Sequence, residues 1–210
     1  MYSGTAAIHL ALILSGVSRG DEVICQSFTF AASAFTILYL EAKPIFVGSE
    51  KESWNMCPRY LENAILHRIE KGKKPKAIIF VNSYGMPAKI NETTSLANKY
   101  DINLIEDAAE SLGSEYDERK CGNFGDFSVF SFNSNKIITT SGGGALVTRS
   151  KKYKELSTHL ATQAKNNKKY YEHHKLGYNY RLSDVLAAIG RGQMQNFERT
   201  LVKKRVNNIF

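Results

Sequence analysis

The stretch Ile102-Asn103-Leu104-Ile105-Glu106-Asp107 is a short apolar run that ends in a carboxylate. Its length and its apolar, β-branched side chains predict a buried strand. Asp107 then stands at the carboxyl end of that strand, and open α/β sheets bind their ligands at that end. Taken alone, Asp107 is explained more simply as a helix cap after a strand.

Runs of the same kind recur along the chain and alternate with helical patterns. Further strands are expected at 22–25, 44–47, 77–82, 127–132 and 145–148, and helices at 5–14, 28–40, 59–70, 91–99, 151–163 and 183–201. Nearly continuous apolar strands that alternate with helices predict a mainly parallel sheet flanked by helices on both faces. We therefore predict an α/β fold that forms one domain over residues 1–210.

Lys136 follows the 127–132 run, in a stretch that we expect to be an exposed loop. A single lysine in such a place is most simply a surface residue. Asp107 and Lys136 together, however, are a carboxylate and an amine at the ends of two core strands, and these are the groups that hold pyridoxal phosphate (PLP). The lysine forms a Schiff base with PLP, and the aspartate keeps the pyridine nitrogen protonated so that the ring accepts electrons. Lys136 and Asp107 are therefore the predicted catalytic residues.

The helix expected at 5–14 begins with Ser3-Gly4-Thr5. A helix start offers unpaired backbone N–H groups and the positive end of a dipole, so that it suits a phosphate, with the Thr5 hydroxyl as a further donor. By itself this motif is an ordinary N-cap. Ser131 is a second candidate donor, and Phe30 is a candidate to lie flat on a cofactor ring. The alternative for Phe30 is a core aromatic on an apolar helix.

Charge and residue spacing weigh against several other classes of protein. The net charge of +8 is concentrated in short lysine runs without interleaved aromatic residues, so we expect no nucleic-acid partner. The three cysteines and five histidines lack the spacing of metal ligands, and no metal is expected. The longest mostly apolar stretch, 28–40, is shorter than the ~20 residues of a membrane span. No signal peptide is recognisable, and we expect a cytoplasmic location without membrane contact.

Six blocks of the sequence carry a family likeness when they are taken together. They are SGTAA (3–7), FTFA (28–31), IEDAAESLG (105–113), GNFGD (122–126), FSFNSNKIITT (130–140) and LGYNYRLS (176–183). In this order they resemble the DegT/DnrJ/EryC1/StrS family of PLP-dependent nucleotide-sugar aminotransferases, essentially from end to end of the chain. The resemblance implies a fold-type I, aspartate-aminotransferase-like large domain.

The resemblance also implies roles for residues around the cofactor ring. Lys136 matches the Schiff-base lysine, and Asp107 matches the partner of the pyridine nitrogen. Glu110 matches the residue near the cofactor 3′-hydroxyl, and Phe30 matches the stacking aromatic. A sugar dehydratase of the same fold is disfavoured, because the resemblance implies a histidine in place of Lys136 in that branch.

Further matches concern the cofactor phosphate. Thr5, Ala6 and Ser131 match phosphate contacts. Asn179 and, as the next candidate, Arg181 match a segment that reaches into the active site of the neighbouring subunit. A homodimer with shared active sites follows as an expectation.

Within the family, the chain is most similar to aminotransferases that act on UDP-4-keto-6-deoxy-N-acetylhexosamines in the bacillosamine and legionaminic acid routes. The implied reaction moves an amino group from an amino acid, with glutamate as the expected donor, to C4 of the nucleotide-linked 4-keto-6-deoxy sugar. Family members extend beyond both ends of this sequence. We therefore expect a large domain truncated at both ends, without the small C-terminal domain. A non-catalytic regulatory relative, or an inactive truncated remnant of such an enzyme, stays open as an alternative.

Overall fold

The computed structural model describes residues 1–207 and has a central sheet of six strands. These strands are β1 (Glu22–Gln26), β2 (Lys43–Val47), β3 (Ala77–Val81), β4 (Asn103–Asp107), β7 (Phe127–Ser131) and β8 (Gly144–Thr148). They are arranged in the order β2-β1-β3-β4-β7-β8, and all neighbours are parallel except the antiparallel pair β7 and β8. A small separate hairpin joins β5 (Glu115–Tyr116) and β6 (Arg119–Lys120). The predicted mainly parallel sheet is confirmed.

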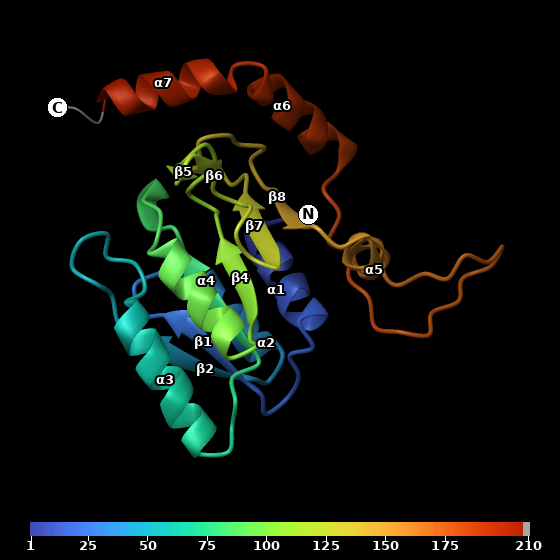
Figure 1. The fold of residues 1–210 in the computed structure, drawn as a ribbon. Coiled ribbons are helices and arrows are strands. Elements are labelled where there is room, and N and C mark those ends of the chain that lie inside the picture. The colour runs from blue at the N-terminus through green and yellow to red at the C-terminus, as the bar shows by residue number, and fades with distance from the viewer. Residues whose placement is uncertain (208–210) are drawn as a thin grey trace.

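Helices cover both faces of the sheet (Figure 1). On one face lie α1 (Gly4–Leu14), α2 (Ala32–Tyr39) and α5 (Lys151–Ala161), and on the other lie α3 (Pro58–Glu70) and α4 (Ile90–Lys99). The strands alternate accordingly, because successive side chains point to opposite faces. Ile79 and Ile105 belong to the core under α1, whereas Ile78 and Leu104 belong to the core under α3 and α4.

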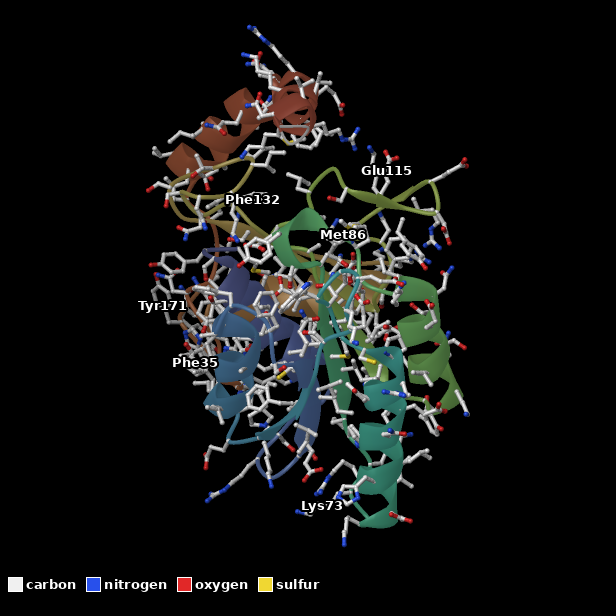
Figure 2. The ribbon with its side chains drawn as sticks, turned by 90° about the vertical axis from the view of Figure 1, so that its left-hand side faces the viewer. Phe35, Lys73, Met86, Glu115, Phe132 and Tyr171 are labelled. Carbon is white, nitrogen blue, oxygen red and sulfur yellow. The ribbon has the colours of Figure 1, made fainter. Side chains whose placement is uncertain are left out.

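The register of the sheet fixes the position of Asp107 along the strands. In the ladder that crosses β3, β4 and β7, Asp107 pairs with Val81 on one side and with Val129 on the other. It is therefore the last residue of a central strand that has neighbours on both sides. Figure 2 shows Phe132 and Met86, which follow β7 and β3, toward one end of the molecule, and Lys73 at the opposite end. The carboxyl ends of the central strands thus share one end of the molecule.

Strand β8 returns beside the start of the chain. A Cβ atom on Gly144 would come within 2.6 Å of the Ser3 carbonyl carbon and 2.7 Å of the Gly4 nitrogen. Only glycine fits such a close approach of two backbones. The backbone of Gly144 also donates a hydrogen bond to the Met1 carbonyl at 2.9 Å. The start of α1 is thereby held against the end of the sheet that carries Asp107.

The helix predicted at 28–40 starts later than expected, and this prediction is corrected. α2 begins at Ala32, and Phe28-Thr29-Phe30 belongs to the loop after β1. The loop is held in a non-helical course because Gln26 Nε2 donates to the Phe28 carbonyl at 2.8 Å. Phe30 is 79% exposed, so the alternative of a core aromatic on a helix is wrong.

The single helix predicted at 183–201 is two helices, α6 (Asp184–Met194) and α7 (Phe197–Asn207). Gln195 and Asn196 separate them, and the Asn196 carbonyl accepts the backbone N–H and the hydroxyl of Thr200, both at 3.0 Å, in the first turn of α7. α7 then packs Phe197 and Leu201 over Gly113. Both helices lie across the end of the molecule toward which β4 and β7 point (Figure 1). Among the helices within residues 1–207, none has both the length and the apolar character that a membrane crossing requires.

Candidate active site

A pocket of about 410 Å³ opens at the carboxyl end of β4 and β7, beside the first turn of α1. Its lining includes five of the residues predicted from the sequence: Thr5, Phe30, Asp107, Ser131 and Lys136. These residues come from α1, the loop after β1, the ends of two strands and the loop after β7. The fold therefore brings together, in a space of ligand size, residues that are far apart in the sequence.

Asp107 is a buried carboxylate with fixed geometry. Its Oδ2 accepts a hydrogen bond from Ser33 Oγ at 2.9 Å, and its Oδ1 accepts one from the Ala109 backbone N–H at 3.2 Å. Burial raises the pKa of this carboxyl, although the two hydrogen bonds and the positive charge of Lys136 act in the opposite direction. Within residues 1–207, no cationic side chain pairs with it directly. The site thus holds an anion that lacks a contacting cation, which a protonated ring nitrogen would provide.

Lys136 lies in the expected loop after β7, but its side chain is not exposed, and this part of the prediction is corrected. Only 14% of its side chain is exposed, because Nζ forms an ion pair with Glu110 Oε1 at 2.9 Å. The other carboxylate oxygen of Glu110 accepts the Tyr84 backbone N–H at 2.7 Å. Burial alone would raise the pKa of Glu110, but the hydrogen bonds from Lys136 and Tyr84 and the charge of Lys136 outweigh it, so that the pKa is lowered. Glu110 therefore holds the amine of Lys136 at the pocket.

The lowered pKa of Glu110 predicts a pH-dependent stability. A carboxyl whose pKa is depressed by folding stabilises the fold above its unfolded pKa of about 4.3, and this contribution is lost as the pH falls through the folded pKa. We expect Glu110→Gln to lower the free energy of unfolding at neutral pH, and the difference from wild type to shrink below about pH 4.3. Urea denaturation of the cofactor-free chain at several pH values measures both.

Glu70→Gln is the matched control for this prediction, because Glu70 is an exposed residue at the end of α3. We expect it to leave the pH profile unchanged. A difference between wild type and Glu110→Gln that stays constant down to about pH 3 would contradict the role of the ion pair.

The start of α1 lines the same pocket as Asp107. Ser3 is the N-cap, and its Oγ accepts the Ala6 N–H at 3.0 Å. The Ala6 amide is thus engaged by the cap rather than directed at the pocket, whereas Thr5 and Ser131 line it. A Cβ on Gly4 would meet Ser131 Cβ at 3.0 Å, so glycine lets the serine lie against the helix start. A helix N-terminus with two hydroxyl groups suits a phosphate.

An aromatic recess of about 230 Å³ adjoins the pocket. Phe28, Phe30, Tyr84 and Glu110 line it, and the Phe28 ring lies 5.8 Å from the ring of Trp54 and 6.2 Å from that of Tyr84. Trp54 and Tyr84 are 62% and 83% exposed. Exposed rings gathered beside a polar site are suited to stacking on a flat ligand group. Sequence reasoning missed Trp54 and Tyr84, which belong to no recognised block.

A second buried carboxylate, Glu106, was also missed as a contributor to the site. Its side chain is fully buried and accepts hydrogen bonds from Asn82 Nδ2, Ser128 Oγ and the backbone N–H groups of Gly122 and Phe124, at 2.7 to 3.0 Å. Four donors satisfy a buried charge that would otherwise be costly. Because Glu106 precedes Asp107, this network holds the strand end that presents Asp107.

Asn179 and Arg181 flank Tyr180, whose carbonyl accepts the backbone N–H of the lining residue Tyr2 at 2.6 Å. Both flanking side chains are exposed, and neither lines the pocket. Glu110 lines the aromatic recess beside the pocket. It also lines a second recess, together with Lys136. Of the nine predicted cofactor residues, five line the pocket and Glu110 lines the recesses beside it, whereas Ala6, Asn179 and Arg181 line neither. Within the described part of the chain, no three His, Cys, Asp or Glu side chains gather as metal ligands.

The pocket fits PLP on the chemistry of its residues. A buried carboxylate is available for a ring nitrogen, an amine for covalent attachment, and a helix start with two hydroxyl groups for a phosphate. Fold and pocket together point to the class of PLP-binding α/β domains. The family model of the DegT/DnrJ/EryC1/StrS aminotransferase family matches residues 1–209. The chain belongs to this family, as the sequence predicted.

Similar proteins carry names from the same family. EpsN of Bacillus subtilis, named as a pyridoxal phosphate-dependent aminotransferase, is 50% identical over 203 residues, which are 97% of this chain and 52% of EpsN. GDP-perosamine synthase of Escherichia coli O157:H7 is 40% identical and covers 97% of this chain and 54% of its own. A UDP-N-acetyl-3-dehydro-α-D-glucosamine 3-aminotransferase of Acidithiobacillus ferrooxidans is 36% identical over 91% of this chain and 50% of its own.

Solved structures agree with the fold. A DegT/DnrJ/EryC1/StrS aminotransferase from Brucella abortus has a TM-score of 0.90 and 34% identity, and the match covers 94% of this chain and 53% of that one. A sugar aminotransferase of Streptococcus pneumoniae in its PLP form has a TM-score of 0.85 and 27% identity over 94% of this chain and 54% of its own. The chain thus spans about half the length of the curated relatives it matches. PLP as the cofactor of the family is confirmed.

Proposed function

We propose that this chain carries the PLP-binding half of a sugar aminotransferase, which moves an amino group from an amino acid to a keto group of a nucleotide-linked sugar. The observation that carries the proposal is that Lys136, Asp107 and the start of α1 line one pocket. The names of the similar proteins, which include synthases and aminotransferases of nucleotide sugars, support this class of substrate.

The residues divide the chemistry among them. When bound, PLP supplies an electron-accepting ring. Asp107 Oδ2, oriented by Ser33, would hold the proton on the ring nitrogen. Lys136 Nζ, held by Glu110 Oε1, would bind the cofactor and then take and return the proton at the reacting carbon of the substrate. Thr5 and Ser131 would hold the phosphate, and Phe30 would lie against the ring.

The finer proposal concerns the position that is aminated. The loop around Lys136 and the segment before Gly177 favour C4 of a UDP-linked 4-keto-6-deoxy-N-acetylglucosamine, with glutamate as donor. The names of the relatives leave this open, because a GDP-perosamine synthase and a 3-aminotransferase are both among them. The aromatic recess beside Glu110 is suited to stack on the base of the nucleotide. A cytoplasmic homodimer belongs to the same proposal.

A comparison of substrates tests the proposal. The purified protein with PLP should convert glutamate to 2-oxoglutarate beyond one equivalent per bound PLP only when a keto sugar nucleotide is present, because the sugar must take the amino group from the cofactor before the next turnover. We expect the 4-keto-6-deoxy sugar to be aminated faster than a 3-keto sugar by roughly 10⁴-fold or more, the discrimination expected where one substrate leaves polar groups of the site unpaired. Equal rates would contradict the choice of C4, and no reaction with any keto sugar nucleotide would contradict the transferase itself.

A further inference from the structure

His9 is a buried histidine that the proposed chemistry does not use. It lies in the second turn of α1 and is 5% exposed. Its Nδ1 lies 3.1 Å from the Tyr180 hydroxyl. The rings of Tyr39, Tyr178 and Tyr180 pack edge-on against it, with centroids at 5.6, 5.1 and 6.0 Å. We call His9 and these three tyrosines the histidine clamp.

A polar ring at this place is costly for the fold. Within residues 1–207, His9 Nε2 is buried and has no hydrogen-bond partner. A buried polar atom without a partner loses its hydration and gains nothing in return. Burial accordingly lowers the pKa of His9 and favours the uncharged ring. A leucine would fill this core position without that cost, so packing alone does not explain the histidine. The hydrogen bond between His9 Nδ1 and the Tyr180 hydroxyl does explain it.

The clamp sets the course of the segment Gly177 to Arg181. Tyr178 and Tyr180 stack on each other at 4.8 Å and face His9, whereas Asn179 and Arg181, which alternate with them, are exposed. This is the alternation of an extended chain. The segment is also held by its backbone, because the N–H groups of Tyr178 and Tyr180 donate to the carbonyls of Leu160 and Ala161 at 2.7 and 3.0 Å.

The outward side chains have no role in the pocket of their own chain. That pocket is lined by one cation, Lys136, and offers a phosphate the start of α1 and two hydroxyl groups. Asn179 and Arg181 add an amide and a guanidinium, which are groups that bind a phosphate well. Leu176, which precedes the segment, is 78% exposed, and Figure 2 shows Phe35 and Tyr171, which are 53% and 82% exposed, on one side of the molecule. Such a surface suits a second copy of this chain.

We propose that His9 is a positioning residue which, through Tyr180, holds Asn179 and Arg181 so that they complete the cofactor pocket of a second copy of this chain. The inference rests on the proposed function. His9 thus acts on the pocket of the partner, although α1, the helix that contains His9, begins at the pocket of its own chain.

Mixed dimers test this directly. His9→Leu leaves Lys136 in place but loosens the segment, so we expect its homodimer to bind PLP roughly 10- to 100-fold more weakly. Lys136→Ala has an intact segment but no amine. When the two variants are dissociated, mixed in equal amounts and reassociated at a PLP concentration that leaves the His9→Leu homodimer largely empty, half of the dimers are mixed and each has one intact site. We expect glutamate-dependent turnover and the borohydride-fixed label on Lys136 to recover to about a quarter of wild type.

Three further variants separate positioning from folding. Tyr180→Phe keeps the ring and removes the hydroxyl, and we expect it to weaken PLP binding like His9→Leu. His9→Asn places an amide where Nδ1 was, and we expect PLP binding within roughly threefold of wild type. His67→Leu, at an exposed histidine of α3, is the matched control and should change nothing. Hydrogen exchange of the cofactor-free protein should show faster exchange at the Tyr180 amide in His9→Leu and Tyr180→Phe only.

The outcomes are distinct. Mixed dimers that recover nothing, although His9→Leu and Lys136→Ala each fold and dimerise, would show that His9 acts within its own chain and would overturn the inference alone. Wild-type PLP binding in both His9→Leu and Tyr180→Phe would do the same. A wild-type protein that takes up no PLP would overturn the proposed function and this inference with it.

Discussion

Replacing Lys136 with alanine is expected to abolish covalent attachment of PLP and to lower turnover by several orders of magnitude, because no other amine lines the pocket in the described residues. Borohydride reduction followed by peptide mass spectrometry should place a pyridoxyl group on Lys136 in wild type and nowhere in the variant. A label on a different lysine in wild type would rule out this assignment.

The ion pair with Glu110 makes the choice of control important. Lys136→Ala leaves a partly buried carboxylate without its cation, so a loss of stability would accompany the loss of the amine. Lys136→Arg keeps a positive charge against Glu110 but carries no group that forms the covalent bond. We expect it to retain wild-type stability and to remain unlabelled. Lys152→Ala, at an exposed lysine of α5, should retain both.

The layered architecture could be predicted from the sequence because its central strands β1, β3 and β4 are buried on both faces. Runs such as Ala77–Val81 are uniformly apolar, and turn residues separate them from helical patterns. The starts and ends of the elements were less accessible. Phe28 and Phe30 are apolar but exposed, since they line a recess instead of the core, and no local pattern distinguishes the two cases. The separate course of α7 goes with the packing of Phe197 and Leu201 against Gly113, which is distant in the sequence.

The candidate site shows the same division. Lys136 and Asp107 were predicted because each follows a recognisable strand. Ser33, Tyr84 and Glu106 were not assigned roles, because their part in the site consists of hydrogen bonds between residues far apart in the sequence. The sequence also made Lys136 an exposed residue, since nothing in the 133–140 stretch indicates that Glu110 would cover it. Propensity and periodicity describe neighbours along the chain and not partners across it.

Asp107→Asn should separate function from stability. The amide keeps the size of the side chain, and its oxygen can accept the Ala109 N–H while its NH₂ group donates to Ser33 Oγ, which lies 3.0 Å from Thr29 Oγ1 and can turn its own proton there. The amide cannot hold the ring nitrogen protonated. We expect PLP still to bind and turnover to fall by roughly 30- to 1,000-fold, which corresponds to about 2–4 kcal/mol of transition-state stabilisation.

Asp107→Asn should lower turnover but should not lower the free energy of unfolding of the cofactor-free protein, because burial raises the pKa of Asp107. A carboxyl whose pKa is raised by burial destabilises the fold while it is charged, so the cost is fully present above the folded pKa and vanishes below the unfolded value of about 3.9. We therefore expect Asp107→Asn to be at least as stable as wild type at neutral pH, with the advantage fading as the pH falls. Urea denaturation measures it, with the exposed Asp101→Asn as control. Unchanged turnover together with reduced stability would instead make Asp107 a structural cap, because a residue that serves the cofactor should lose activity without weakening the fold that carries it.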